Sequence, residues 1–503
     1  MTTPSTATSP DVAATEVLRQ WHPIAVVATR LVFLAVATCV AFWNSFDQYA
    51  HLVAGDPLSS YLPLIPVAAL ACAYGTTIRK PKELPINDRQ IDAIVGGVLI
   101  VGAFLVKAIL VGRFEDVYYL TSPSAPAVWL FAIAGSVLMF GLRPTARYRW
   151  MWLLVLLMLP LPHRIVLIAL GGSALAAGVI TSIYAGYAIG VGAARTRRDG
   201  LVYGVVIAAA GVVLAVCMWA AGVSDGRALT LAPGIIAGTA VGCWILWRRR
   251  GLSAREYRDH GFDDPVVRGP RKAAAFVAVM AVVTAFVGIA NPPTLPAAHV
   301  PGLATGESLR VPAGWRQVGA THRYGWVSAL FGSGSVMQRQ RILADVPNIS
   351  WDDKNRRRSV MIDTVTTDYL LPLDIYPVTS LYDLNKARFS DPQSADLGHG
   401  VDAQIRSVVD EAKFLTFTIM TWRWRSGDRW QEIRLLSVDN HEPDAPFPVP
   451  TLSIGRNLAL LVNALVRGNS VTADRRPLFK DRDMLVDVGH DIVDAQIQAG
   501  GSQ

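Results

Sequence analysis

Residues 271–291 (RKAAAFVAVMAVVTAFVGIAN) decide how the chain is organised, because they form its last long apolar run. An apolar run of about 20 residues has the length that an α-helix needs to cross the hydrocarbon core of a bilayer. The sequence before this run is mostly apolar, whereas the sequence after it is charged and rich in turn-forming residues. We therefore predict that this segment is the last transmembrane helix and that a domain outside the membrane follows it.

The composition of the whole chain is that of an integral membrane protein. Of its 503 residues, 52% are hydrophobic and 17% are charged, whereas about 25% of the residues in soluble domains are charged. The net charge of +8 comes from Lys and Arg residues in short loops between apolar runs. Such loops indicate topology rather than a phosphate-binding face. The predicted partner is therefore a lipid bilayer, and no nucleic acid is expected.

The apolar runs predict an α-helical polytopic membrane bundle of about nine spans, followed by a C-terminal soluble α+β domain. Residues 1–23 are rich in Ser, Thr, Ala and Pro and are predicted to be a disordered cytoplasmic tail. Residues 24–290 form the transmembrane domain, residues 291–309 a linker and residues 310–503 the exterior domain. The predicted spans lie near residues 24–43, 60–77, 91–112, 126–142, 150–170, 173–194, 201–222, 231–247 and 272–290.

The basic residues alternate between the loops that join these spans. One set of alternate loops contains only Arg113, Arg164 and Arg227. The other set holds the basic clusters within residues 79–89, 143–149, 195–198 and 248–272. Because Lys and Arg accumulate on the cytoplasmic side, this bias predicts a cytoplasmic N-terminus and an exterior C-terminal domain. The composition favours a bacterial cytoplasmic (inner) membrane.

The exterior region has the periodicity of strands and a few helices. Residues 335–343 and 359–369 are predicted strands, and residues 414–424 and 430–438 form a predicted hairpin across Ser426-Gly427-Asp428. Residues 394–400 are expected to be a polar loop. Three helices are predicted at residues 379–389, 453–466 and 481–498.

No recognised catalytic or metal-binding motif occurs in the exterior region. It lacks the GxSxG, HExxH and P-loop patterns and has no cysteine. The four cysteines of the chain lie in apolar runs without zinc-ligand spacing. We therefore predict no metal site and no cofactor. These cysteines are Cys39, Cys72, Cys217 and Cys243.

Ionisable residues inside a membrane are candidate functional residues. His163 and Arg164 follow Pro160-Leu161-Pro162, which breaks the fifth predicted span at its outer end. They mark either a functional site or an interfacial anchor. Arg30 and Lys107 lie near span ends, where snorkelling to the interface explains them.

The stretch Trp422-Arg423-Trp424-Arg425 is the richest in the exterior region. In a strand, Trp422 and Trp424 share one face and Arg423 and Arg425 share the other. One interpretation is an aromatic and arginine platform that binds a sugar, a peptide or a lipid headgroup. The other, which we favour, is a hairpin whose tryptophan face packs on the domain core.

The first part of the chain resembles the exosortase/archaeosortase family of polytopic membrane proteases and transpeptidases. The resemblance rests on residues 61–66 (YLPLIP), 135–143 (GSVLMFGLR) and 153–162 (LLVLLMLPLP). The C-terminal region looks like the exosortase-associated domain that is fused to some members. The family implies a Cys–Arg–His arrangement at the outer face, with the cysteine in a Cys-Ser-Gly context.

This chain departs from that pattern, because it contains no Cys-Ser-Gly. Cys217 is the cysteine near the outer end of a late span, and Arg227 follows it. The residues and the resemblance leave three hypotheses open. The first is a non-enzymatic envelope protein that assembles or binds an exported glycan, lipid or protein. The second is an active exosortase-type cysteine protease or transpeptidase, and the third is a transporter.

Overall fold

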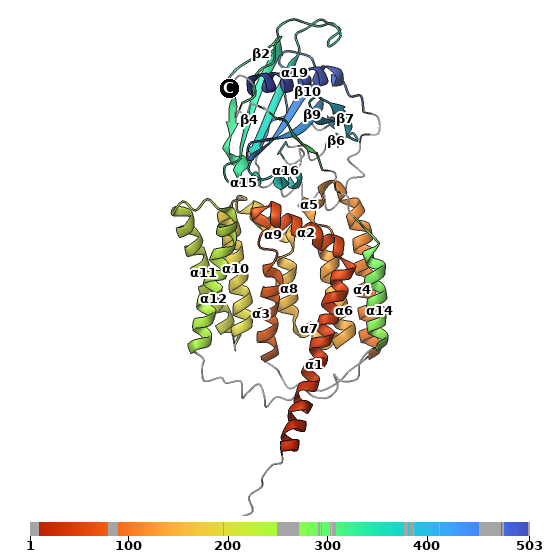
Figure 1. Ribbon diagram of the computed structural model, residues 1–503, viewed down its shortest axis with the longest axis vertical. Helices are drawn as coiled ribbons and strands as arrows, with labels where there is room; N and C mark the ends of the chain where they lie inside the picture. The colour runs from red at the N-terminus through yellow and green to blue at the C-terminus, as the bar shows by residue number, and fades with distance from the viewer. Residues whose placement is uncertain are drawn as a thin grey trace, which may run out of the picture.

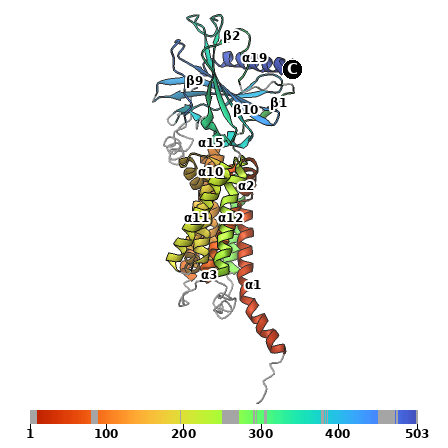
Figure 2. The same ribbon diagram turned by 90° about the vertical axis from the view of Figure 1, so that its left-hand side faces the viewer.

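The computed structural model divides the chain into a helical N-terminal part and a sheet domain (Figure 1). It describes residues 10–78, 89–194, 196–248, 271–289, 292, 294–301, 303, 308–376, 381–382, 384, 387–411, 413–451, 474 and 477–500. Figure 2 shows that the sheet domain lies at one end of the helices, with the start of α1 (Pro10–Ala41) at the other.

The helical part is a bundle whose helices run mostly side by side (Figure 1). After α1 come α2 (Trp43–Gly55), η1 (Pro57–Ser59), α3 (Leu64–Ile78), α4 (Arg89–Arg113), η2 (Glu115–Val117), α5 (Tyr118–Thr121), α6 (Ala125–Phe140), α7 (Leu142–Arg147), α8 (Arg149–Leu157), α9 (Pro160–Ala169), α10 (Ala174–Ala193), α11 (Arg197–Ala220), α12 (Gly226–Arg248) and α14 (Arg271–Ala285).

Within the described residues, five helical segments are long and apolar enough to cross a membrane. The number rises to seven if each of two bent helix pairs counts as one span. Helices also lie at the remaining predicted positions, but α6 has 16 residues and α14 has 15. A helix of 15 residues is about 22 Å long, which is shorter than the ~30 Å hydrocarbon core. The protein is therefore a multi-pass membrane protein with five to seven candidate spans among the described residues.

The two bent pairs place short helices across the end of the bundle that faces the sheet domain (Figure 1). The chain turns by 83° between α1 and α2, and by 60° between α8 and α9. Pro160 stands in the first turn of α9, where proline is tolerated because the backbone N–H has no intrahelical partner. The predicted break in the fifth run is present, although α8 already ends at Leu157. The N-terminal helix also begins earlier than expected, at Pro10.

Two cations predicted to snorkel instead bond to backbone carbonyls near helix ends. Lys107 of α4 is 1% exposed, and its ammonium group donates to the carbonyl oxygens of Ala41 and Thr284. Arg30 of α1 donates to the carbonyl oxygen of Met139, near the end of α6, at 3.0 Å. The last carbonyls of a helix lack intrahelical partners and carry partial negative charge. The snorkelling prediction is therefore corrected for Lys107, which joins helices inside the protein. Arg30 is half-buried and bonds to the end of a neighbouring helix.

The C-terminal domain is built on one ten-stranded sheet with the order β2-β4-β5-β10-β9-β8-β6. Of the three remaining strands, β3 pairs with β4 and β7 with β8, both antiparallel, while β1 pairs with β9 in parallel. The strands are β1 (Ala297–His299), β2 (Trp315–Gln317), β3 (His322–Tyr324), β4 (Val336–Ala344), β5 (Ser359–Thr367), β6 (Arg388–Phe389), β7 (Gln393–Asp396), β8 (Asp402–Asp410), β9 (Leu415–Ser426) and β10 (Arg429–Val438).

The predicted hairpin is confirmed, because β9 and β10 pair antiparallel around Gly427. The strands predicted at residues 335–343 and 359–369 correspond to β4 and β5. The domain is richer in strands than the predicted α+β class, since β7 occupies part of the expected polar loop and β6 the end of the expected helix 379–389. The other residues of that helix lie partly outside the described ones, and the helix 453–466 lies wholly outside them.

The two faces of the sheet have different neighbours. On one face, α19 (Arg482–Gly500), which was predicted at 481–498, packs through Leu485, Val488 and Ile492 against Trp422 and Trp424. The other face looks toward the bundle and carries the short helices η4 (Gly325–Val327), α15 (Ser328–Phe331) and α16 (Leu371–Ile375) (Figure 1).

Candidate functional site

The sheet domain and the bundle share one hydrophobic core. Leu52 of α2, Leu120 of α5 and Ile168 of α9 belong to the same buried cluster as Phe331 and Leu373 of the sheet domain. Helix α16 contacts both α2 and α5. We call this region, where η1, α2, α5 and α9 meet α15 and α16, the junction. A continuous apolar core of this kind resists independent motion of the two parts.

The backbones approach closely at the junction. Gly172, just after α9, has a φ of +71°, and a Cβ atom there would lie 2.5 Å from the carbonyl oxygen of Ala329 in α15. At Gly55, a Cβ atom would lie 2.9 Å from the Cβ of Leu371. Glycine is required where a chain adopts positive φ or another backbone comes this close. Both positions therefore let the sheet domain rest directly on the bundle.

Helix α9 carries His163 and Arg164 into the junction. His163 is 1% exposed, and its ring stacks on Tyr61 with 3.7 Å between ring centroids and 20° between ring planes. The ring of Tyr184 on α10 lies 5.9 Å away. The imidazole therefore lies beside aromatic rings from two other segments of the bundle.

Three of the four side-chain polar atoms in this group of rings lack a hydrogen-bond partner. Both ring nitrogens of His163 and the hydroxyl of Tyr61 are buried without a hydrogen bond in the structure. By contrast, the hydroxyl of Tyr184 donates to the carbonyl oxygen of Leu157 at 2.8 Å. Leaving a buried donor or acceptor unpaired costs about 1–3 kcal/mol. A buried unpaired group of this kind points to strain, to a functional role or to a bound water or ion.

Arg164 links the stack to a second polar group. Its guanidinium donates to the carbonyl oxygen of Tyr119 and, at 3.3 Å, to the hydroxyl of Ser59. Ser59 in turn donates to the carboxylate of Asp56 at 2.5 Å, and the backbone N–H of Leu58 donates to the same carboxylate at 3.0 Å. All three side chains belong to buried residues. Asp56 also interacts electrostatically with Arg164, and this interaction between a carboxylate and a guanidinium is attractive.

The sheet domain covers these groups with Tyr376, which follows α16. Tyr376 is 5% exposed, and burial raises the pKa of its phenol to about 12, with Arg164 acting in the opposite direction. The phenol is therefore neutral at physiological pH and retains its proton for donation. The junction thus gathers His163, Tyr61, Arg164, Asp56 and Tyr376 from both parts of the protein.

The other two residues predicted near the outer face lie apart from this cluster. Arg227, at the start of α12, donates to the carbonyl oxygen of Ala54 at the end of α2, but is exposed. Cys217 is exposed on α11, beside the exposed side chains of Val216 and Trp219. The structure thus places His163 and Arg164 together, brings Arg227 to the neighbouring end of α2, and leaves Cys217 on the outside of the bundle.

The residues of the predicted platform lie in two environments. Trp422 and Trp424 are fully buried against α19, which is the arrangement of the core-packing interpretation. Arg423 faces the other side of the sheet and bonds to Glu432 and Asp374, each at 2.6 Å. Arg425 remains partly exposed and lies over the ring of Trp430.

Sequence reasoning missed a buried row of charges on the sheet face that looks toward the bundle. Arg339 forms two hydrogen bonds of 2.7 and 2.6 Å with Asp363, which also accepts from Tyr382. Glu432 accepts from Arg434 and Arg423, and Arg423 continues to Asp374. Burial raises the pKa of Asp374, and Arg423 opposes that rise. The sequence signal for this row was a pair of charges at alternate positions of a predicted strand, Glu432 and Arg434 of β10.

Comparison of the chain with protein-family models, with curated proteins and with solved structures finds no match.

Proposed function

We propose that this protein is a non-catalytic component of a bacterial cell envelope, which binds an exported glycan, lipid or protein where its sheet domain meets the membrane bundle. In this proposal the N-terminus is cytoplasmic and the sheet domain exterior. The alternation of basic loops supports that orientation. The site would take a polar group of a ligand presented at the outer surface of the bilayer.

The observation that carries this proposal is the set of unpartnered polar atoms at the junction. His163 and Tyr61 are almost fully buried, yet three of their polar atoms make no hydrogen bond. A chain selected only for stability would place apolar side chains there. Local violations of folding rules concentrate at functional sites, so these polar atoms support a functional role for the junction. Arg164 stands beside them, and its guanidinium carries N–H donors suited to an acceptor-rich group.

The shared core supports a binding role for the sheet domain as well. A domain that shares a buried apolar core with the bundle would hold its ligand close to the membrane surface. Such an arrangement suits the assembly or retention of an exported component.

The first test replaces His163 by Phe and, separately, Tyr61 by Phe in a strain that lacks the chromosomal copy. Each substitution keeps an aromatic ring in the stack and removes unpartnered polar atoms. The proposal predicts that both variants accumulate in the membrane at wild-type levels but fail to complement the deletion. Full complementation by both variants would contradict the junction as the functional site.

The exosortase-type alternative has a separate test, because it requires a thiolate nucleophile. A chain in which Cys39, Cys72, Cys217 and Cys243 are all replaced by Ala is expected to complement fully. Loss of complementation on Cys217→Ala, in a chain that still accumulates, would favour the protease and refute the non-catalytic proposal.

A further inference from the structure

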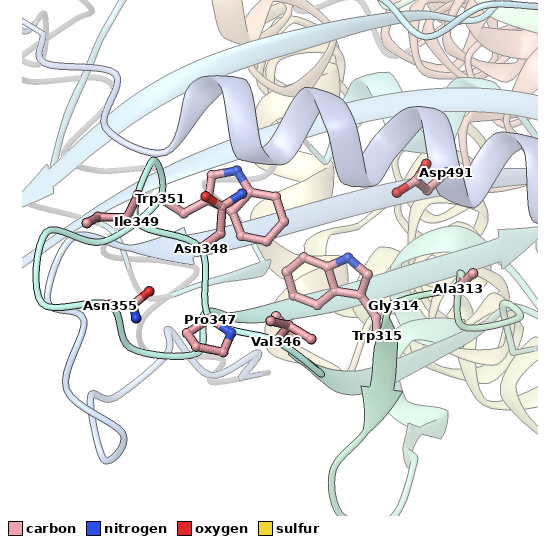
Figure 3. Close-up of a pocket in the computed structure, with 11 residues that line it drawn as sticks. Ala313, Gly314, Trp315, Val346, Pro347, Asn348, Ile349, Trp351, Asn355 and Asp491 are labelled. Carbon is pink, nitrogen blue, oxygen red and sulfur yellow. The ribbon is translucent and has the colours of Figure 1, made fainter.

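A pocket opens in the sheet domain at the end that lies away from the bundle (Figures 1 and 3). It has a volume of about 670 Å³ and lies between the start of β2, the loop that joins β4 to β5, and α19. Pockets of roughly 300–1,000 Å³ are the size that small ligands occupy. Protein partners instead require broad surfaces of about 800 Å² on each side.

Two tryptophans form the apolar wall of this pocket (Figure 3). The rings of Trp315 and Trp351 stack with 5.7 Å between their centroids and 26° between their planes. Trp315 is 7% exposed and Trp351 is half-buried. Trp315 therefore supports Trp351, which offers the more accessible indole to a ligand.

The remaining wall consists of small or aliphatic residues and three polar ones. Asn348 and Asn355 come from the β4–β5 loop, and Asp491 comes from α19. Burial raises the pKa of Asp491, and the neighbouring carboxylates of Asp487 and Asp494 raise it further. The lining residues include no Lys, Arg or His. These acidic groups would repel an anionic ligand, whereas carboxamides and a carboxylate are good partners for hydroxyl groups.

The loop that carries Trp351 is held in place by the residue that follows it. The buried carboxylate of Asp352 accepts from the backbone N–H and the guanidinium of Arg356, and lies 2.9 Å from His441 Nδ1. The backbone N–H of Trp351 donates to Asn348 at 3.1 Å. A pocket whose walls are already ordered loses less conformational entropy on binding.

We propose that this pocket binds a neutral oligosaccharide, with one sugar ring stacked on Trp351 and its hydroxyl groups bonded to Asn355 and Asp491. A pyranose ring has an apolar face of C–H groups and a polar rim, which matches an indole beside amide and carboxylate groups. The inference rests on the proposed exterior location of the sheet domain, and it assigns a site distinct from the junction.

The test measures binding of four probes, maltohexaose, cellohexaose, mannohexaose and chitohexaose, to the full-length protein in lipid nanodiscs. Nanodiscs avoid glycoside detergents, which would compete for a sugar site. Saturation-transfer NMR identifies the probe that binds, and titration gives its dissociation constant. We expect at least one probe to bind saturably. Trp351→Ala should weaken that binding by about tenfold or more, which corresponds to ~1.4 kcal/mol, whereas Trp351→Phe should retain most of it.

A matched pair of carboxylates tests the polar wall. Asp491→Asn is expected to weaken binding, whereas Asp487→Asn, which changes an exposed carboxylate outside the pocket lining, should not. Failure of all four probes to bind, or equal binding by wild type and Trp351→Ala, would overturn the proposal. Binding of a proline-rich peptide that depends on Trp351, without binding of any sugar, would also overturn it.

The junction and the pocket can fail independently. His163→Phe should leave oligosaccharide binding unchanged. His163 lies on α9 of the bundle, whereas the pocket opens at the end of the sheet domain that lies away from the bundle. A protein that binds no sugar but still loses complementation on His163→Phe would refute the pocket assignment and support the junction. The reverse result would support the pocket and refute the junction.

Discussion

The ammonium nitrogen of Lys107 lies 2.7 Å from the carbonyl oxygen of Thr284 and 3.1 Å from that of Ala41, and so joins α4 to the ends of α14 and α1. Replacing Lys107 by Met keeps the apolar stem but leaves these carbonyls without their cation. An unpaired buried acceptor costs about 1–3 kcal/mol, so we expect a clear fall in the thermal midpoint of the purified protein. Lys272→Met, at the exposed start of α14, is the control, and an equal fall in both variants would contradict this role.

Arg423 is predicted to stabilise the sheet domain through its two buried carboxylate partners. Arg423→Met would leave Asp374 without its cation and Glu432 with only Arg434, and breaking a buried ion pair costs about 3–5 kcal/mol. Arg425→Met removes a partly exposed arginine from the same strand and should cost less than about 1 kcal/mol. The free energy of unfolding of the full chain compares the two variants, and similar losses would refute the buried network as a source of stability.

The close contact at Gly172 predicts how the sheet domain is held on the bundle. Gly171 and Gly172 both have positive φ, of +94° and +71°, but a Cβ atom at Gly171 would meet nothing within 4 Å. Both alanine variants carry backbone strain, whereas only Gly172→Ala collides with Ala329. Hydrogen exchange should therefore increase in α15 and α16 for Gly172→Ala alone. Equal exchange in the two variants would show that this contact does not hold the domain.

Asp352 is expected to make the stability of the β4–β5 loop depend on pH. Hydrogen bonds from Arg356 hold the pKa of Asp352 below its usual range. A depressed carboxyl pKa adds stability that is present above the unfolded pKa of about 3.9 and is lost as the pH falls toward the folded value. Between pH 5 and pH 3, Asp352→Asn should lose less stability than wild type does. The exposed neighbour gives the control Asp353→Asn, which should follow wild type, and a wild-type slope in Asp352→Asn would contradict the prediction.

The sequence predicted the elements whose signals are local. The hairpin of β9 and β10 follows from a Ser-Gly-Asp turn between two β-rich runs, and α19 follows from its apolar period. The bend before α9 follows from Pro160 and Pro162. The number of spans was less predictable, because hydropathy marks apolar runs but does not show where a helix ends or bends. Helices α6 and α14 are apolar yet short.

The sites themselves depend on contacts between distant parts of the chain. Tyr61, in the turn between η1 and α3, and His163 of α9 are neighbours only through the tertiary fold. Trp315, Trp351 and Asp491 likewise line one pocket from three separate segments. Periodicity placed Trp422 and Trp424 on one face, but it could not choose between a core and a platform. Lys107 was interpreted as a snorkelling residue because its position near a span end does not show which way its side chain points.

Substitution of Tyr61 by Phe tests the account of the junction most directly, because it removes one unpartnered hydroxyl and nothing else. The comparison is Tyr184→Phe, which removes a hydroxyl that donates to Leu157 at 2.8 Å. The measurement is the thermal midpoint of each purified variant. The account predicts that Tyr61→Phe is as stable as wild type or more stable, and that Tyr184→Phe loses about 1 kcal/mol. A loss in Tyr61→Phe equal to that in Tyr184→Phe would show that the Tyr61 hydroxyl serves folding, and would contradict the proposed site.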